Sequence, residues 1–87
     1  MHGAGTVHIG APRTAAESLY IGVFETRDFL PRVRVNGVDA PVSLAHRDID
    51  LSEFRTTLPP EAVLWKRMEV TIESSVQALR FGYAEVR

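Results

Sequence analysis

Alternation of apolar and polar residues is the dominant pattern along the chain, and it predicts a mostly β structure. The clearest run has apolar residues at every second position, namely Met68, Val70 and Ile72. This period of two is typical of a strand with one buried and one solvated face. Shorter β-rich runs occur elsewhere, and we expect further strands at residues 6–9, 18–26 and 78–86.

Residues 32–40 carry the strongest local signal. The dipeptide Asn36-Gly37 lies between two alternating runs, and this pair favours a two-residue hairpin turn because both turn positions need positive φ. The pairing that follows sets Val35 opposite Val38 and Arg34 opposite Asp39. Directly opposed residues share a face of a sheet, so we expect one apolar face and one ion-paired face.

The remaining segments complete a small antiparallel fold. Residues 48–51 alternate like a short extended edge, and residues 52–58 resemble one or two helical turns that Pro59-Pro60 ends. We therefore expect an all-β class, a β-sandwich or partly open barrel of six or seven strands with at most one or two short helical turns. Thr14 and Glu17 match a helix-start pattern, so an α+β fold is the alternative. Residues 1–5 are expected to form a flexible arm, and residues 6–87 a single domain.

Several strand strings resemble those of small β-sandwich accessory modules. The strings are Leu19–Glu25 followed by Arg32–Val38, and Met68–Ser74 followed by Leu79–Ala84. They are similar to strings in jelly-roll and carbohydrate-binding-like domains of bacterial enzymes that make or trim glycans. The resemblance implies binding or domain packing in a bacterial protein, and it transfers no ligand residue.

Composition narrows the function classes. The 87 residues include no cysteine and carry a formal net charge of -1, which excludes disulfides and thiol chemistry and argues against nucleic-acid binding. No apolar run reaches the roughly 18 residues of a transmembrane helix, so no membrane partner is expected. The first residues do not read as a secretory signal, which favours the cytoplasm.

Two sets of side chains are candidates for chemistry. His46, Asp48 and Asp50 would project to one side of an extended segment, where an imidazole and two carboxylates could hold a divalent metal; a solvated edge is the alternative interpretation. Trp65, Tyr20 and Tyr83 are the candidate ligand-binding aromatics, because such rings stack on sugars; packing in the core is the alternative for them.

A binding or assembly role is the function that these patterns favour. No catalytic motif is present, so we expect a non-enzymatic module that recognises a carbohydrate or a protein partner and needs no cofactor. The alternative is a small metal-dependent enzyme or metal-binding protein that uses His46, Asp48 and Asp50. The final strand, through Val86, reads as a free edge without a clean solvent face, so we also expect a homodimer.

Overall fold

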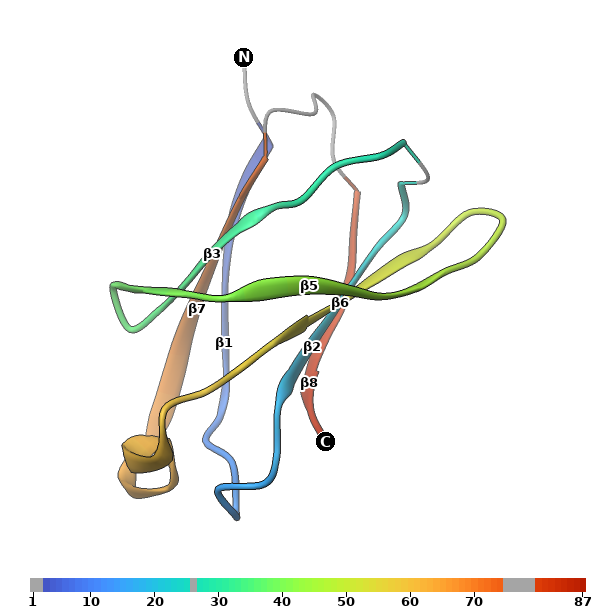
Figure 1. Cartoon of the computed structure of the whole chain (residues 1–87). Coiled ribbons are helices and arrows are strands. Elements are labelled where there is room, and N and C mark those ends of the chain that lie inside the picture. Colours follow the sequence, from blue (N-terminus) through green and yellow to red (C-terminus); the bar gives the residue numbers. More distant parts are fainter. Residues whose placement is uncertain (1–2, 26, 75–79) are drawn as a thin grey trace.

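Two four-stranded antiparallel sheets pack against each other as a β-sandwich (Figure 1). The computed structural model describes residues 3–25, 27–74 and 80–87. Within these residues the chain forms eight strands, one 3-10 turn and no closed barrel. The all-β class predicted from the alternating pattern is therefore confirmed, and the α+β alternative is not.

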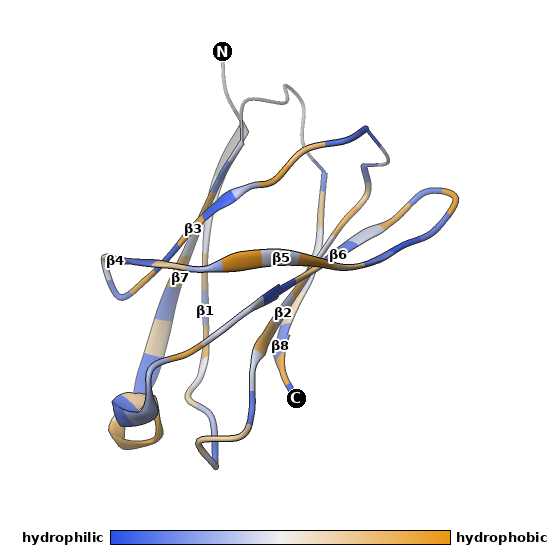
Figure 2. Cartoon of the chain, in the orientation of Figure 1, coloured by the Kyte–Doolittle hydropathy of each residue, from blue (hydrophilic) through white to orange (hydrophobic). Residues whose placement is uncertain are grey.

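The first sheet has the strand order β1-β7-β3-β4. Its strands are β1 (Gly3–Gly10), β7 (Arg67–Ser74), β3 (Arg32–Val35) and β4 (Val38–Ala40). Polar and apolar residues alternate along β7, as the sequence predicted (Figure 2). β7 is a central strand, and its apolar residues Met68, Val70 and Ile72 face the second sheet and are all buried.

The second sheet has the strand order β5-β6-β2-β8. Its strands are β5 (Val42–Arg47), β6 (Ser52–Thr56), β2 (Leu19–Val23) and β8 (Phe81–Val86). A single residue, Pro41, separates β4 from β5, so the chain passes there from one sheet directly to the other. Leu19, Ile21 and Val23 of β2 and Phe54 of β6 face the first sheet and complete the core.

The hairpin around Asn36-Gly37 has the predicted turn and register. Asn36 and Gly37 have φ values of 51° and 82°, both in the left-handed region that this turn requires. Val35 pairs with Val38, and Arg34 pairs with Asp39. The apolar face is only half buried, however: Val35 is 2% exposed and Val38 is 68% exposed. The tip of the hairpin therefore extends beyond the core.

The segment from residue 48 to residue 58 differs from its prediction. Residues 48–51 form the turn between β5 and β6, closed by a 2.7 Å hydrogen bond from Asp48 N to Leu51 O. Ile49, expected in a strand, lies 89% exposed at the tip. The expected helical turns at residues 52–58 are instead strand β6, in which Ser52, Phe54 and Thr56 face inward and are fully buried. Two polar residues at inward positions had hidden the period of two.

The last strand also differs from its prediction, and its pairing contains an irregularity. Its pairing with β2 shifts between Gly22 and Val23, so that Tyr83 pairs with Gly22 while Phe81 pairs with Val23. The spacing of Leu79, Phe81 and Tyr83 at every second position predicts that Leu79 and Phe81 are buried. For Phe81 this prediction is wrong: its side chain is 43% exposed although it pairs with the buried Val23, and Ala84 packs against the core instead. Leu79, predicted to be buried, lies outside the described residues.

The N-terminal part of the chain begins its strand early. Residues 3–5, expected in a flexible arm, belong to β1. The helix-start pattern at Thr14 and Glu17 forms only a local turn, in which a Glu17 carboxylate oxygen accepts hydrogen bonds from the backbone N–H groups of Arg13 and Thr14 at 2.5 and 2.9 Å. Strand β2 follows directly, as the strand interpretation required.

Candidate functional site

The structure separates the three candidate aromatic residues. Trp65 follows the 3-10 turn η1 (Pro60–Leu64) at one end of the sandwich. Tyr20 and Tyr83 lie together on the outer face of the second sheet, on the adjacent strands β2 and β8. The three residues therefore belong to two places with different neighbours.

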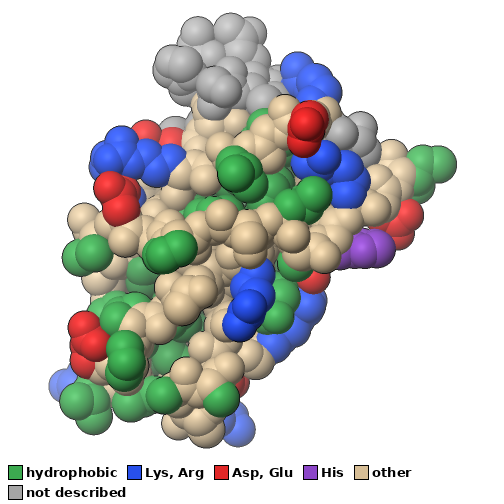
Figure 3. Space-filling model, in the orientation of Figure 1, with side chains coloured by type: hydrophobic (Ala, Val, Ile, Leu, Met, Phe, Trp, Pro, Cys, Tyr) green, Lys and Arg blue, Asp and Glu red, His purple; other side chains and the backbone are tan. Residues whose placement is uncertain are grey.

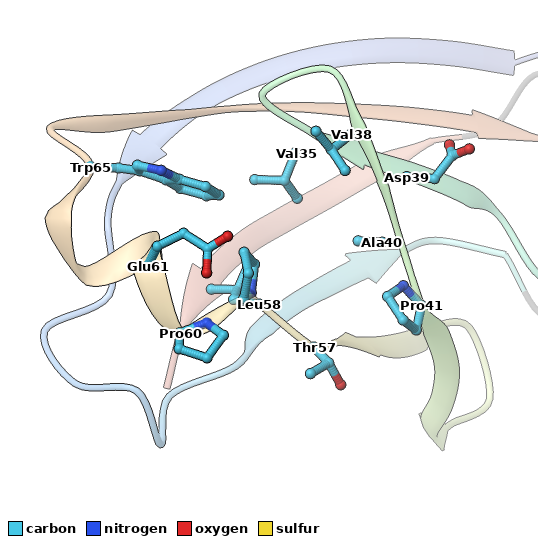
Figure 4. Close-up of a pocket in the computed structure, with 11 residues that line it drawn as sticks. Val35, Val38, Asp39, Ala40, Pro41, Thr57, Leu58, Pro60, Glu61 and Trp65 are labelled. Carbon is cyan, nitrogen blue, oxygen red and sulfur yellow. The ribbon is translucent and has the colours of Figure 1, made fainter.

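Trp65 lines an apolar pocket of about 390 Å³, which we call the hairpin pocket. Its walls come from the β3–β4 hairpin on one side and from residues 57–65 on the other (Figure 4). Most of the lining is aliphatic or aromatic: Val35, Val38, Ala40, Leu58, Pro60 and Trp65 are among the residues that form it. Apolar side chains gather in the same region of the surface, over the hairpin and η1 (Figure 3).

Local sequence explains why the pocket stays open. Pro59 and Pro60 cannot continue the ladder of β6, and Pro60 instead begins η1. Ala62 is fully buried and anchors that turn to the core. The backbone N–H of Trp65 then donates a 3.0 Å hydrogen bond to the Ala62 carbonyl, which fixes the start of the next extended segment. The tryptophan ring is thereby held opposite the hairpin.

Two carboxylates border the hairpin pocket, and their surroundings differ. Asp39 accepts two 3.0 Å hydrogen bonds from the Arg32 guanidinium and a third, at 3.4 Å, from Arg34. The Arg32 hydrogen bonds are the main reason that the pKa of Asp39 is lowered. The Glu61 carboxylate points toward Leu58 in the pocket (Figure 4), and within the described part of the chain it has no hydrogen-bond or ion-pair partner.

Tyr20 and Tyr83 belong to a cluster that already satisfies itself, which we call the tyrosine cluster. The Tyr83 hydroxyl donates a short hydrogen bond to Glu53, and the Arg87 guanidinium donates to the same carboxylate at 2.9 and 3.2 Å. The Arg87 guanidinium also lies 4.6 Å from the centre of the Tyr20 ring and 5.9 Å from that of Tyr83. One cation therefore covers both aromatic rings.

These contacts shift the titration of two groups. The hydrogen bond from Tyr83, followed by those from Arg87, lowers the pKa of Glu53. Burial, followed by the Glu53 carboxylate, raises the pKa of Tyr83. Only 12% of the Glu53 side chain is exposed, so the carboxylate acts as the shared acceptor of the tyrosine cluster rather than as a free ligand group.

Gly22 explains the position of the Tyr83 ring. A Cβ atom built on Gly22 would overlap the ring, so the ring lies directly on the backbone of β2. A glycine in a strand often marks such a close approach, and an aromatic ring on the neighbouring strand covers the exposed backbone. The missing side chain of Gly22 therefore provides the space that the Tyr83 ring occupies.

The candidate metal ligands His46, Asp48 and Asp50 lie at the end of β5 and in the turn between β5 and β6. His46 belongs to β5, and its Nε2 atom is 3.9 Å from a carboxylate oxygen of Asp48; both side chains are about two-thirds exposed. Among residues 3–25, 27–74 and 80–87, no three His, Cys, Asp or Glu side chains gather as a metal site would require. Asp50 joins no such group, and metal binding at these residues stays a prediction without a built site.

Sequence reasoning missed most of the hairpin pocket. Trp65 was a candidate, but Glu61, Leu58 and Val38 were not. A signal was present for Val38, because a valine next to an Asn-Gly turn lies at a hairpin tip where little covers it. No local signal marks Glu61, since its role depends on a hairpin more than twenty residues earlier in the chain.

Comparison of the chain with family models, with curated proteins and with solved structures found no match. Among the described residues, no helix is long and apolar enough to cross a membrane. The hairpin pocket and the tyrosine cluster must therefore be interpreted from their own geometry.

Proposed function

We propose that the protein is a binding module whose hairpin pocket takes an apolar side chain of a partner protein, with a basic residue of the partner beside it. The observation that carries the proposal is the Glu61 carboxylate at the wall of a mostly apolar pocket, whose other carboxylate, Asp39, is already held by Arg32 and Arg34. Within the described residues, no Lys or Arg lines that pocket. An apolar group with a neighbouring cation matches both properties.

The lining favours a protein side chain over a sugar. Sugar recognition needs several convergent hydrogen-bonding groups, because each buried hydroxyl must be satisfied. The polar side chains in the lining are Glu61, Thr57 and Asp39, of which Asp39 is already hydrogen-bonded to Arg32 and Arg34, and the other walls are mostly hydrocarbon or ring. The stacking faces of Tyr20 and Tyr83 are covered by Arg87, which weakens the carbohydrate alternative on that face as well.

Magnitudes indicate that the hairpin pocket is an anchor within a larger contact. Full burial of one leucine-sized side chain contributes about 1.5–3 kcal/mol, and an exposed ion pair adds about 1 kcal/mol or less. Their sum is at most about 4 kcal/mol, which corresponds to a dissociation constant of about 1 mM or weaker. Val38 and Leu64, which are 68% and 82% exposed, provide further apolar surface at the same end of the molecule.

A titration with two matched dipeptides tests the proposal. The probes are the acetylated, amidated dipeptides Leu-Arg and Leu-Glu, added to isotope-labelled protein and followed by NMR. Trp65 is the single tryptophan, so its indole N–H signal reports on the pocket. We expect Leu-Arg to shift this signal at millimolar concentration and Leu-Glu to bind several-fold more weakly, because it carries the wrong charge for Glu61.

Two variants make the test specific. Glu61→Gln should abolish the preference for Leu-Arg, whereas Asp50→Asn, which removes another exposed carboxylate in the turn between β5 and β6, should leave it unchanged. Shifts that map away from Trp65, or a preference that survives Glu61→Gln, would refute the proposal. Binding of glucose or N-acetylglucosamine at Trp65 without binding of either dipeptide would favour the carbohydrate alternative.

The bacterial origin and cytoplasmic location stay predictions.

A further inference from the structure

The four edge strands of the sandwich differ in how they resist pairing with another chain. Free strand edges associate unless they are short, bulged, charged or interrupted by proline. β4 has three residues and is followed by Pro41. β5 has a bulge between Leu44 and His46. β8 has a register shift in its pairing with β2. It contains the charged residue Glu85, and the charged residue Arg87 follows the end of the strand.

β1 has none of these protections. Its eight residues pair with β7 in an unbroken register, from Gly3 opposite Ser74 to Gly10 opposite Arg67. The strand contains no proline, lysine, arginine or acidic residue, and His8 is its one titratable side chain. Within the described residues β7 is its sole hydrogen-bonded neighbour, so the other edge of β1 presents backbone groups along the whole strand.

An apolar seam continues from this edge. Val7 and Ile9 of β1 face the core but are only partly buried, whereas Val70 and Met68, their partners on β7, are fully buried. β8 lies close to β1 across the same side of the sandwich, and its inward residues Ala84 and Val86 are also only partly buried. Among the described residues neither sheet has a further strand there, so none of these residues covers the seam.

We infer that β1 pairs antiparallel with β1 of a second copy of this chain, which joins the two first sheets into one. A second copy fits because the strand is complementary to itself under a two-fold axis. Directly opposed residues share a face of a sheet. The exposed Thr6 and His8 would therefore lie beside the same residues of the second copy on the outer face. Val7 and Ile9 would lie beside the second copy's seam on the inner face. The strand has no Asp, Glu, Lys or Arg, so none of these charged side chains can face its own copy in any register.

This inference moves the expected homodimer from the last strand to the first. The same two-fold axis brings the two β8 edges near each other, which adds the seam residues Ala84 and Val86 to the contact. It is also independent of the hairpin pocket, which is lined by residues 35–65 and lies outside β1 and β8.

A pair of lysine variants tests the inference by sedimentation equilibrium. The wild-type protein is expected to reach twice the 9.7 kDa mass of the chain as its concentration rises. Thr6→Lys adds an edge charge of the kind that natural edge strands use, and it should raise the dimer dissociation constant by roughly tenfold or more. Ser43→Lys adds the same charge to the exposed edge strand β5 and should leave dimerisation unchanged. Circular dichroism confirms that both variants are folded.

Cysteine cross-linking provides a second measurement, because the natural chain has no cysteine. The double variant Thr6→Cys/His8→Cys places thiols at the exposed positions around the expected two-fold axis, and we expect an intermolecular disulfide under mild oxidation. Ser43→Cys is the control and should not cross-link above background. A wild-type chain that stays monomeric at all concentrations would overturn the inference. So would a dimer that Thr6→Lys leaves intact or that Ser43→Lys disrupts equally.

Discussion

The hairpin pocket and the tyrosine cluster contain similar side chains, but only those of the tyrosine cluster already contact one another. Each combines an aromatic ring with a carboxylate. In the tyrosine cluster, Arg87 covers the rings and shares the Glu53 carboxylate with Tyr83. In the hairpin pocket the Trp65 ring borders empty space, and Glu61 has no partner among the described residues. The comparison shows that residue types alone do not distinguish an internal network from an open site.

The same difference separates stability from binding. Groups that satisfy each other within one chain stabilise the fold, because removal of one leaves the others desolvated and unpaired. Groups left open contribute little to the fold and are available to a ligand. Substitutions in the tyrosine cluster should therefore change the free energy of unfolding, and substitutions in the hairpin pocket should change binding alone.

The largest expected effect is that of Gly22→Ala. The added Cβ would overlap the Tyr83 ring, and displacement of the ring would break its hydrogen bond to Glu53. We expect a loss of up to about 3 kcal/mol in the free energy of unfolding, measured by urea denaturation. Gly10→Ala is the control, because a Cβ there meets nothing within 4 Å. Equal stability of the two variants would show that the ring does not rest on Gly22.

Removal of the shared acceptor should have the next largest effect. Glu53→Ala leaves the Tyr83 hydroxyl and Arg87 without their common carboxylate, and we expect a loss of roughly 1–2 kcal/mol on urea denaturation. Glu85→Ala removes the other carboxylate that contacts Arg87, and the Glu85 side chain is 50% exposed. That control should cost less than about 0.5 kcal/mol. A larger loss for Glu85→Ala would place the centre of the network elsewhere.

Acid should weaken the tyrosine cluster in a predictable direction. Because the folded state lowers the pKa of Glu53, the stabilisation is fully present above the ordinary carboxyl pKa of about 4.3 and is lost as pH falls through the folded value. The stability difference between wild type and Glu53→Gln should therefore shrink between pH 7 and pH 3, as measured by urea unfolding at each pH. A constant difference would contradict the assignment of the shift to Glu53.

The smallest effect on stability is expected in the hairpin pocket. Glu61→Gln changes an exposed carboxylate that has no partner among the described residues, so the free energy of unfolding should stay within about 0.5 kcal/mol of wild type. Val38→Ser should behave similarly, because Val38 is already 68% exposed. Thermal denaturation of both variants checks this expectation. A strong destabilisation by either one would mean that the pocket is structural.

The parts of the fold that were predictable are those in which local chemistry and hydrophobic period agree. Asn36-Gly37 fixed both a turn and a register, and the alternation along β7 identified its buried face. β6 was misread because Ser52 and Thr56 occupy inward positions, so the sequence shows no apolar alternation. The buried face of β8 was not predictable, because one face carries Phe81 and Tyr83 and the other carries Ala84 and Val86, and no local residue pattern marks the register shift between Gly22 and Val23.

The candidate site was less predictable because its walls come from distant segments. Trp65 was identifiable as an amphipathic aromatic residue, yet the hairpin that faces it belongs to residues 35–41. The pairing of Tyr20 with Tyr83 depends on the contact between β2 and β8. Arg87 determines that the rings of Tyr20 and Tyr83 are covered, and no sequence motif marks Arg87 for this position.

The pairing of β1 with β7 also governs the order in which the chain can fold. β1 begins at residue 3, but its hydrogen-bonded neighbour begins at Arg67, so during synthesis the first strand must wait for most of the chain. Closing so long a loop carries an entropic cost before any contact repays it, and sheets built from distant pairings fold in milliseconds to seconds rather than microseconds. The β3–β4 hairpin, closed by two residues, can form at once and offers β7 a template on which to dock before β1 completes the sheet.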